Sequence, residues 1–225
     1  MIQSVEQIRA PLNRTLGHRA VDEYMRALLT QLRLADDDAP RTIGLTSCAA
    51  REGVSTLAAG LAACAALDLG RPTLLVDAHL AHPDVNNRFG VSDPRGLAEY
   101  LAGQTDAESC CRSTPVPNLS ILAAGAPTAR AASVSAPARF PALLERLKSQ
   151  FAWIIVDLPS IGELHNCLPL VGALDGTVVV MESERVRASE AQRAQQRLQQ
   201  ANARLLGVVF NKRTLHVPEW LYRRL

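Results

Sequence analysis

The stretch "LTSCAAREGVSTLAAGLAACAAL", residues 45–67, has the layout of a phosphate-binding loop. A short apolar strand precedes the loop, and Ser55 and Thr56 open an alanine-rich helix after it. In such loops backbone N–H groups and the helix N-terminus surround a phosphate, a lysine neutralises the outer phosphates, and Ser or Thr binds magnesium. Val54 stands where that lysine is needed. The sequence therefore predicts a phosphate-binding loop that lacks its main cation.

The match to the loop pattern G-x-x-x-x-G-K-[ST] is partial. Residues 48–55 read C-A-A-R-E-G-V-S, so Gly53 and Ser55 fit whereas Cys48 and Val54 do not. The pattern alone is also that of an ordinary strand-to-helix turn. Its position between a strand and a helix favours the phosphate-binding loop, because the motif requires that context.

Apolar runs alternate with helix-length segments from residue 42 onward, which is typical of βαβ units. The expected strands are residues 42–46, 72–78, 118–125, 153–159, 176–182 and 205–211. The expected helices are residues 55–69, 95–102, 138–150, 165–173 and 187–202, with a crossover loop at 126–137. Continuous apolar runs suit strands buried on both faces. We therefore expect an α/β fold with a doubly wound, mostly parallel sheet and helices on both faces.

Two carboxylates close strands of this predicted sheet. Asp77 ends the strand in "LLVDAHLAHP", and Asp157 ends the one in "WIIVDLPS". The carboxyl ends of parallel strands border the crevice where α/β sheets bind ligands. Asp77 and Asp157 are therefore expected to converge on the loop.

The pattern divides the chain into three parts. Residues 41–212 form the expected P-loop-like α/β domain, and residues 213–225 form a short C-terminal tail. Residues 1–40 form an N-terminal helical extension that either packs on the sheet edge or mediates assembly. Its expected apolar side consists of Tyr24, Leu28 and Leu32. Its expected polar side, available to solvent or a partner, consists of Glu23, Arg26 and Arg33.

Composition limits the classes of function. The chain has 24 basic and 22 acidic side chains, scattered rather than blocked, which does not indicate a nucleic-acid partner. The longest apolar run, Leu57–Leu67, is about half of a membrane span, and the N-terminus has no apolar core of a secretion signal. We expect a cytoplasmic protein. Its cysteines form no CxxC pair and are interpreted as reduced thiols, of which Cys48 is the one candidate for catalysis.

An ordered series of segments carries a family resemblance. The loop is followed by "LLVDA", "GLAEYLAG", "NLSILAAG", "IIVDLPS", "DGTVVVME" and "LLGVVFNK". Over residues 20–212 this order resembles the cytoplasmic domain of bacterial tyrosine kinases (BY-kinases), which partner polysaccharide co-polymerases in capsule and exopolysaccharide export. These kinases belong to the P-loop ATPases with a deviant Walker A motif, as do MinD and ParA.

The chain departs from the family pattern at several positions. The family loop resembles T-S-x-x-P-G-E-G-K-S-T, and the matching residues here are Thr46, Ser47, Glu52, Gly53, Ser55 and Thr56. Its proline, first glycine and lysine are replaced by Ala50, Arg51 and Val54. In the second motif, which resembles D-x-D-x-R, Asp77 remains while His79 and Ala81 replace the acid and the arginine. The chain is therefore identified as a degenerate member.

The resemblance implies roles for individual residues. Asp77 would be a vestigial base, and Ser55 and Asp157 would hold Mg²⁺ only if nucleotide binds. The vestigial nucleotide-binding residues would be Arg51, Gly53, Val54, Ser55, Thr56 and Asn211, the last facing adenine. Glu23 and Arg26 keep part of the family's oligomerisation motif, and Tyr222 is the candidate phosphorylation site in the tail.

The leading hypothesis is a cytoplasmic scaffold, a pseudokinase recruited to the inner face of the membrane by a polysaccharide co-polymerase. It is expected to form homo-oligomers and to have no resident cofactor beyond weak binding of Mg-ATP or Mg-ADP. The first alternative is a weakly active tyrosine autokinase or ATPase that uses Arg51 in place of the lysine. The second is a MinD-like or ParA-like positioning factor.

The empty loop is expected to close on itself. Arg51 would pair with Glu52, Asp77 or Asp157, because two buried carboxylates without a cation or hydrogen-bond donors are costly. His79 has no partner at ligand spacing, so it is expected to be a hydrogen-bonded histidine of the crevice and not a zinc ligand.

Overall fold

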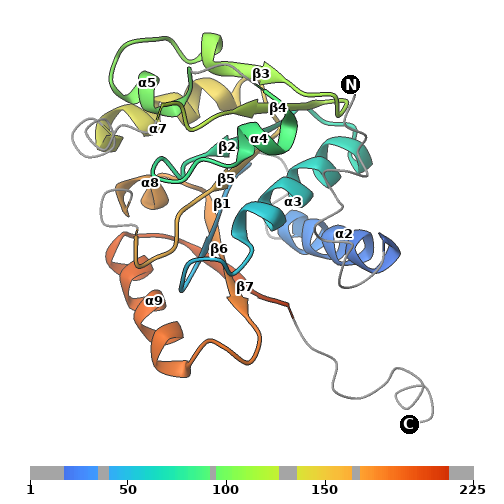
Figure 1. Cartoon of the computed structure of the whole chain (residues 1–225), viewed down its shortest axis with the longest axis vertical. Helices are drawn as coiled ribbons and strands as arrows, with labels where there is room; N and C mark the ends of the chain where they lie inside the picture. The colour runs from blue at the N-terminus through green and yellow to red at the C-terminus, as the bar shows by residue number, and fades with distance from the viewer. Residues whose placement is uncertain (1–17, 35–40, 92–94, 127–135, 164–167, 213–225) are drawn as a thin grey trace.

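Seven strands form one sheet in the computed structural model, which describes residues 18–34, 41–91, 95–126, 136–163 and 168–212 (Figure 1). The strand order is β3-β4-β2-β5-β1-β6-β7. The strands are β1 (Arg41–Ser47), β2 (Thr73–Asp77), β3 (Cys111–Ser113), β4 (Leu119–Leu122), β5 (Trp153–Asp157), β6 (Gly176–Glu182) and β7 (Leu205–Asn211). All neighbouring strands are parallel except β3 and β4. The predicted α/β fold class is confirmed.

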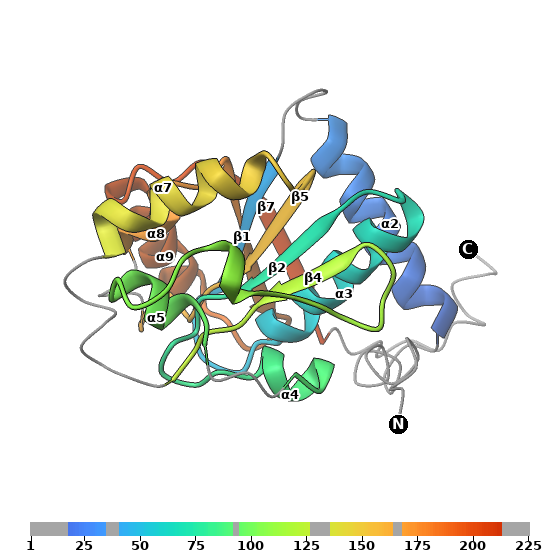
Figure 2. The same cartoon turned by 90° about the horizontal axis from the view of Figure 1, so that it is seen from above.

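Helices cover both faces of the sheet. They are α2 (His18–Leu34), α3 (Val54–Asp68), α4 (Val85–Phe89), α5 (Leu97–Leu101), the 3₁₀ turn η1 (Glu108–Cys110), α7 (Ala136–Lys148), α8 (Leu168–Gly172) and α9 (Ala188–Gln200). One core cluster joins the sheet to α2 and α3, and a second joins it to α7, α8 and α9. Figure 2 shows the central strands running between α7 and α3.

The six expected strands are all present, with ends shifted by a few residues. β3 and α4 were not predicted, because each is short and has no periodic apolar pattern. The crossover loop expected at 126–137 lies largely outside the described residues, and α7 begins at Ala136. The helix expected at 165–173 is described only as α8.

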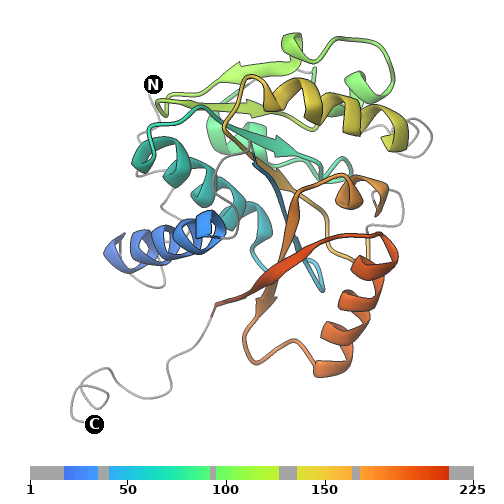
Figure 3. The same cartoon turned by 180° about the vertical axis from the view of Figure 1, so that it is seen from behind.

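Helix α2 packs on α3 (Figure 3). Met25, Leu29 and Leu32 are buried in the core cluster that contains α3. Tyr24 was expected on this apolar side but is 67% exposed. The prediction was wrong because the spacing 25, 29, 32 follows one face of a helix, and Tyr24 lies outside it.

Candidate functional site

The phosphate-binding loop connects β1 to α3 at the carboxyl edge of the sheet. Gly53 precedes α3 with φ 93°, a left-handed conformation that favours glycine. A Cβ atom at Gly53 would lie 2.3 Å from Nδ2 of Asn211. Glycine is therefore required here both by the backbone and by the close approach of β7.

Glu52 is a buried carboxylate that holds the loop from inside. Its side chain is 1% exposed and accepts a hydrogen bond from the N–H of Ala49 (3.0 Å) and a longer one from the N–H of Glu182 (3.4 Å). The family resemblance matched Glu52 by position, but sequence reasoning gave it no role. Ala49 lies three residues away in the same loop, but Glu182 lies on β6, so only the fold brings that donor to Glu52.

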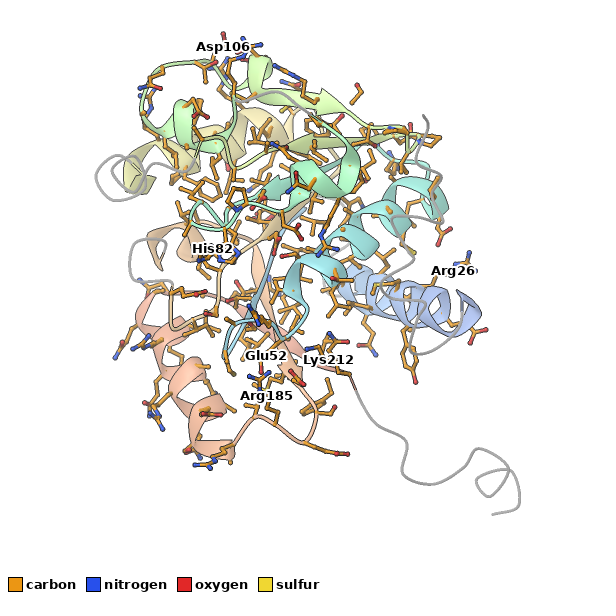
Figure 4. All side chains as sticks on the ribbon, viewed as in Figure 1. Arg26, Glu52, His82, Asp106, Arg185 and Lys212 are labelled. Carbon is orange, nitrogen blue, oxygen red and sulfur yellow. The ribbon has the colours of Figure 1, made fainter. Side chains whose placement is uncertain are left out.

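The end of β7 fastens the loop from outside. Nδ2 of Asn211 donates to the carbonyl of Glu52 (2.8 Å), and Nζ of Lys212 donates to the carbonyl of Arg51 (2.7 Å). Nζ of Lys212 also lies 3.1 Å from Oε2 of Glu182. Figure 4 shows Glu52 and Lys212 close together, with Arg185 beside them. We call Glu52, Glu182, Asn211 and Lys212 the loop-anchoring residues.

The side-chain amide of Asn211 is occupied by these contacts. Besides the bond to Glu52, its Oδ1 accepts from the N–H of Lys212 (2.9 Å). That Asn211 faces adenine stays a prediction; in this structure its side-chain amide bonds the loop backbone. Lys212 had no assigned role, although it directly follows the asparagine in sequence.

Asp77 and Asp157 lie opposite each other at the ends of β2 and β5, as predicted. Asp77 accepts hydrogen bonds from the N–H groups of His79 (2.9 Å), Asp84 (3.1 Å) and Val85 (3.2 Å). Burial nevertheless raises the pKa of Asp77, and these bonds counter the effect in part. Hydrogen-bond donors beside the pair were expected, and Asp77 has them.

Asp157 has no such backbone donors among the described residues. Its side chain is 1% exposed, and neither carboxylate oxygen has a hydrogen-bond partner among the described residues. Burial, and then the charge of Asp77, raise the pKa of Asp157 to about 8, while the Ser55 hydroxyl lowers it. Asp157 is therefore largely protonated at neutral pH. Ser55 therefore acts on the carboxyl group with which the resemblance pairs it in binding magnesium, a role that stays a prediction.

Arg51 does not close the site. Its side chain is exposed, its φ is 68°, and within the described residues no ion pair joins it to Glu52, Asp77 or Asp157. The expected pairing was wrong because a left-handed residue at the loop apex carries its side chain outward. The cation that acts on Asp157 is Arg88, which pairs with Asp84 and lowers the pKa of Asp157.

The remaining candidates lie around the crevice. Nε2 of His79 is buried without a hydrogen-bond partner among the described residues and lies 3.7 Å from Oε2 of Glu163. The expectation that His79 is a hydrogen-bonded histidine of the crevice stays a prediction. Burial, and then Glu52 and Glu190, raise the pKa of Cys48 to about 11, so its thiol is protonated and is a poor nucleophile.

The assembly residues lie away from the loop. Glu23 is exposed on α2, and Nε of Arg26 pairs with Oδ2 of Asp68 on α3 at 2.8 Å. Tyr222 and Cys167 are outside the described residues. Within the described ranges, no group of three or more His, Cys, Asp or Glu could hold a metal ion. No helix in the same ranges is long and apolar enough to cross a membrane.

Comparisons with known proteins relate this geometry to tyrosine kinases. The chain is 28% identical over 195 residues to the tyrosine-protein kinase CpsD of Streptococcus agalactiae, covering 86% of this chain and 84% of that protein. The BceF tyrosine kinase domain has a TM-score of 0.75 and 26% identity, with 93% and 90% of the two chains covered. The chimerical protein CapA2B2 has a TM-score of 0.80 and 24% identity, with 95% and 93% covered. No protein-family model matches the chain.

Proposed function

We propose that this chain, a BY-kinase-like domain related to the capsule and exopolysaccharide tyrosine kinases, acts as a scaffold and not as a kinase. The partner is an inner-membrane polysaccharide co-polymerase, which recruits the domain to the cytoplasmic face of the membrane. The domain works there as a homo-oligomer. The name of the chimera CapA2B2 supports such a partner, because it joins two protein names in one chain.

The observation that carries this proposal is the state of the phosphate-binding loop. Val54 supplies no charge where a lysine would contribute charge-assisted hydrogen bonds of roughly 1.5–3 kcal/mol each. The loss of one such bond weakens nucleotide binding by about tenfold to a hundredfold, and the loss of two by about a hundredfold to ten-thousandfold. The described residues bring no other cation to this position: Arg51 is exposed, and Lys212 is bonded to the Arg51 carbonyl and to Glu182.

Phosphoryl transfer would suffer more than binding. It depends on positioning and on stabilisation of charge in the transition state. By the resemblance, the loop lysine, the second acid and the arginine of the second motif are all replaced, at Val54, His79 and Ala81. The residues that remain, Ser55 and Asp157, fit a magnesium ion, but the loop does not fit the negative charge of a triphosphate.

Isothermal titration calorimetry with Mg-ATP and with Mg-ADP tests the proposal. The natural protein, Val54→Lys and Val54→Met are compared, because methionine matches the length of the lysine stem without its charge. We expect no heat of binding from the natural protein and Val54→Met at millimolar nucleotide, and binding by Val54→Lys. Micromolar binding by the natural protein would overturn the scaffold proposal.

A second candidate function is weak ATP binding and hydrolysis with Arg51 as the cation. It is favoured by one observation: Arg51 lies in the loop with its side chain exposed, and no ion pair joins it to another of the described residues. A guanidinium binds phosphate through two parallel hydrogen bonds. This candidate requires magnesium-dependent turnover by the natural protein that Arg51→Gln abolishes and the nearby Arg185→Gln leaves unchanged.

A further inference from the structure

Strand β7 is an unprotected sheet edge. It is the outermost strand on its side of the described sheet, and it runs for seven residues without a charged side chain or a proline (Figure 3). Natural edge strands are usually short, charged or interrupted, because their free N–H and C=O groups pair readily with other chains. The opposite edge follows this rule: β3 has three residues, with Arg112 in the middle.

The same strand concentrates exposed apolar side chains. Leu205, Val208 and Phe210 are 39%, 42% and 68% exposed, and in the described residues Tyr24 is the other large hydrophobic side chain that is exposed. We call Leu205, Val208 and Phe210 the apolar strip.

The apolar strip lies on one face of the sheet. Val208 pairs with Val179 and Phe210 with Met181, and both partners belong to the core cluster under α7, α8 and α9. The register shift between Thr177 and Val178 brings Leu205 onto this face as well. The strip therefore continues the buried face of β6 to the edge, where no described element covers it.

Charges at both ends of β7 select the kind of partner. Arg204 precedes the strand and Lys212 follows it, and both side chains are exposed. Glu182 is shared between Lys212 and Arg185, so at this end one carboxylate lies between two cations. A second copy paired antiparallel about Val208 would place Arg204 of each strand opposite Lys212 of the other, and like charges opposite each other are unfavourable.

We infer that β7 docks an extended segment of another protein that joins the sheet as an added strand. This segment has apolar side chains at alternate positions, which pack beside the apolar strip, and acidic residues at both ends, which pair with Arg204 and Lys212. Backbone hydrogen bonds supply affinity in this mode of recognition, and the alternate side chains supply specificity. The inference does not depend on whether the loop binds nucleotide.

A synthetic peptide serves as the probe. The sequence Asp-Glu-Val-Thr-Val-Thr-Val-Asp-Glu, labelled with fluorescein, is titrated with the full chain, and a control peptide carries lysine at the four acidic positions. Fluorescence anisotropy reports affinity, and amide hydrogen exchange reports where the peptide binds. We expect slower exchange in β7, and affinity at least about tenfold weaker for the control peptide.

Matched variants distinguish peptide binding at the apolar strip from non-specific binding to other exposed apolar side chains. Phe210→Thr removes the aromatic ring but keeps a residue that favours strands, and it should weaken peptide binding at least about tenfold. Tyr24→Ala removes an equally exposed aromatic ring from α2 and should leave binding unchanged. Arg204→Ser should weaken the acidic peptide but not the lysine peptide.

Four outcomes would overturn the inference. The first two are equal affinity for the acidic and the lysine peptide, and an equal loss of peptide affinity in Phe210→Thr and Tyr24→Ala. The third is unchanged hydrogen exchange in β7 when the peptide is added. The fourth is a dimer in sedimentation that Phe210→Thr abolishes, which would make a second copy the occupant. A fifth outcome comes from deleting residues 213–225. If hydrogen exchange in β7, measured without peptide, were faster in the shortened protein than in the full chain, that tail would be the occupant.

Discussion

The carboxyl group of Asp157 is buried beside Asp77, and its pKa rises from 3.8 to about 8. The native state therefore binds a proton over a pH range in which the unfolded chain has already released it. The free energy of unfolding must then fall as pH rises from about 4 to about 8. Asp77 acts in the same direction, because burial raises its pKa as well.

Asp157→Asn should remove this dependence. Asparagine has nearly the same shape as aspartate and no charge. The free energy of unfolding of the variant, minus that of the natural protein, should therefore rise by roughly 1 kcal/mol per pH unit between pH 6 and 8. Urea unfolding at both pH values measures the difference. Parallel pH profiles for the two proteins would contradict the assigned pKa of Asp157.

Gly53 offers a second test at the same scale, because two separate effects act there. Alanine would be strained at φ 93°, and its Cβ would meet Nδ2 of Asn211. Gly70 is the matched control, because it has φ 60° and open space around it. Gly70→Ala should cost about 1 kcal/mol from backbone strain alone, and Gly53→Ala should cost more.

The double variant Gly53→Ala/Asn211→Ala isolates the contact. If the side chain of Asn211 causes the additional loss, the two substitutions should be non-additive, and the difference appears in a double-mutant cycle of unfolding free energies. Additive losses would mean that Asn211 moves aside freely and does not hold the loop.

At the scale of elements, the contact between α2 and α3 combines an apolar face with an exposed ion pair. Leu29 is 3% exposed, whereas the side chain of Arg26 is 60% exposed at its pair with Asp68. Leu29→Ala should cost about 2–5 kcal/mol, because it leaves a cavity between the helices. Arg26→Gln should cost less than about 1 kcal/mol.

Urea unfolding ranks these two variants, and sedimentation separates stability from assembly. The resemblance assigns Arg26 to oligomerisation, so Arg26→Gln should lower the oligomer mass while leaving the fold intact. A large loss of stability in Arg26→Gln, equal to that of Leu29→Ala, would instead make the ion pair a structural element of the monomer.

At the scale of the whole molecule, the sequence could predict what depends on local pattern and could not predict what depends on long-range side-chain contacts. Apolar runs located the six longer strands, and parallel topology then brought Asp77 to Asp157. The hydrogen bonds that hold the phosphate-binding loop to the end of β7 could not be predicted in this way. Asn211 contacts Glu52 across 159 positions of sequence, and Lys212 contacts Arg51 across 161. Such pairs have no local signature, and the exposed Arg51 was the more obvious candidate because it lies in the motif.

The two core clusters share the strands, so neither should unfold without the other. On β5, Ile154 belongs to the cluster of α7 and Ile155 to the cluster of α3, although they are neighbours in sequence. The chain has two tryptophans, and Trp220→Phe leaves Trp153 on β5 as the single fluorescent reporter of this shared layer. We expect its fluorescence and the far-UV circular dichroism to follow one common urea transition.

Leu61→Ala on α3 and Leu144→Ala on α7 test this coupling from opposite faces. Both side chains are almost fully buried, so each substitution should lower stability by about 2–5 kcal/mol. Because β5 carries side chains of both clusters, each variant should shift the fluorescence and dichroism transitions together. If Leu144→Ala moved the dichroism transition to lower urea than that of Trp153, the α7 side would unfold separately, and the sheet would not act as one cooperative layer.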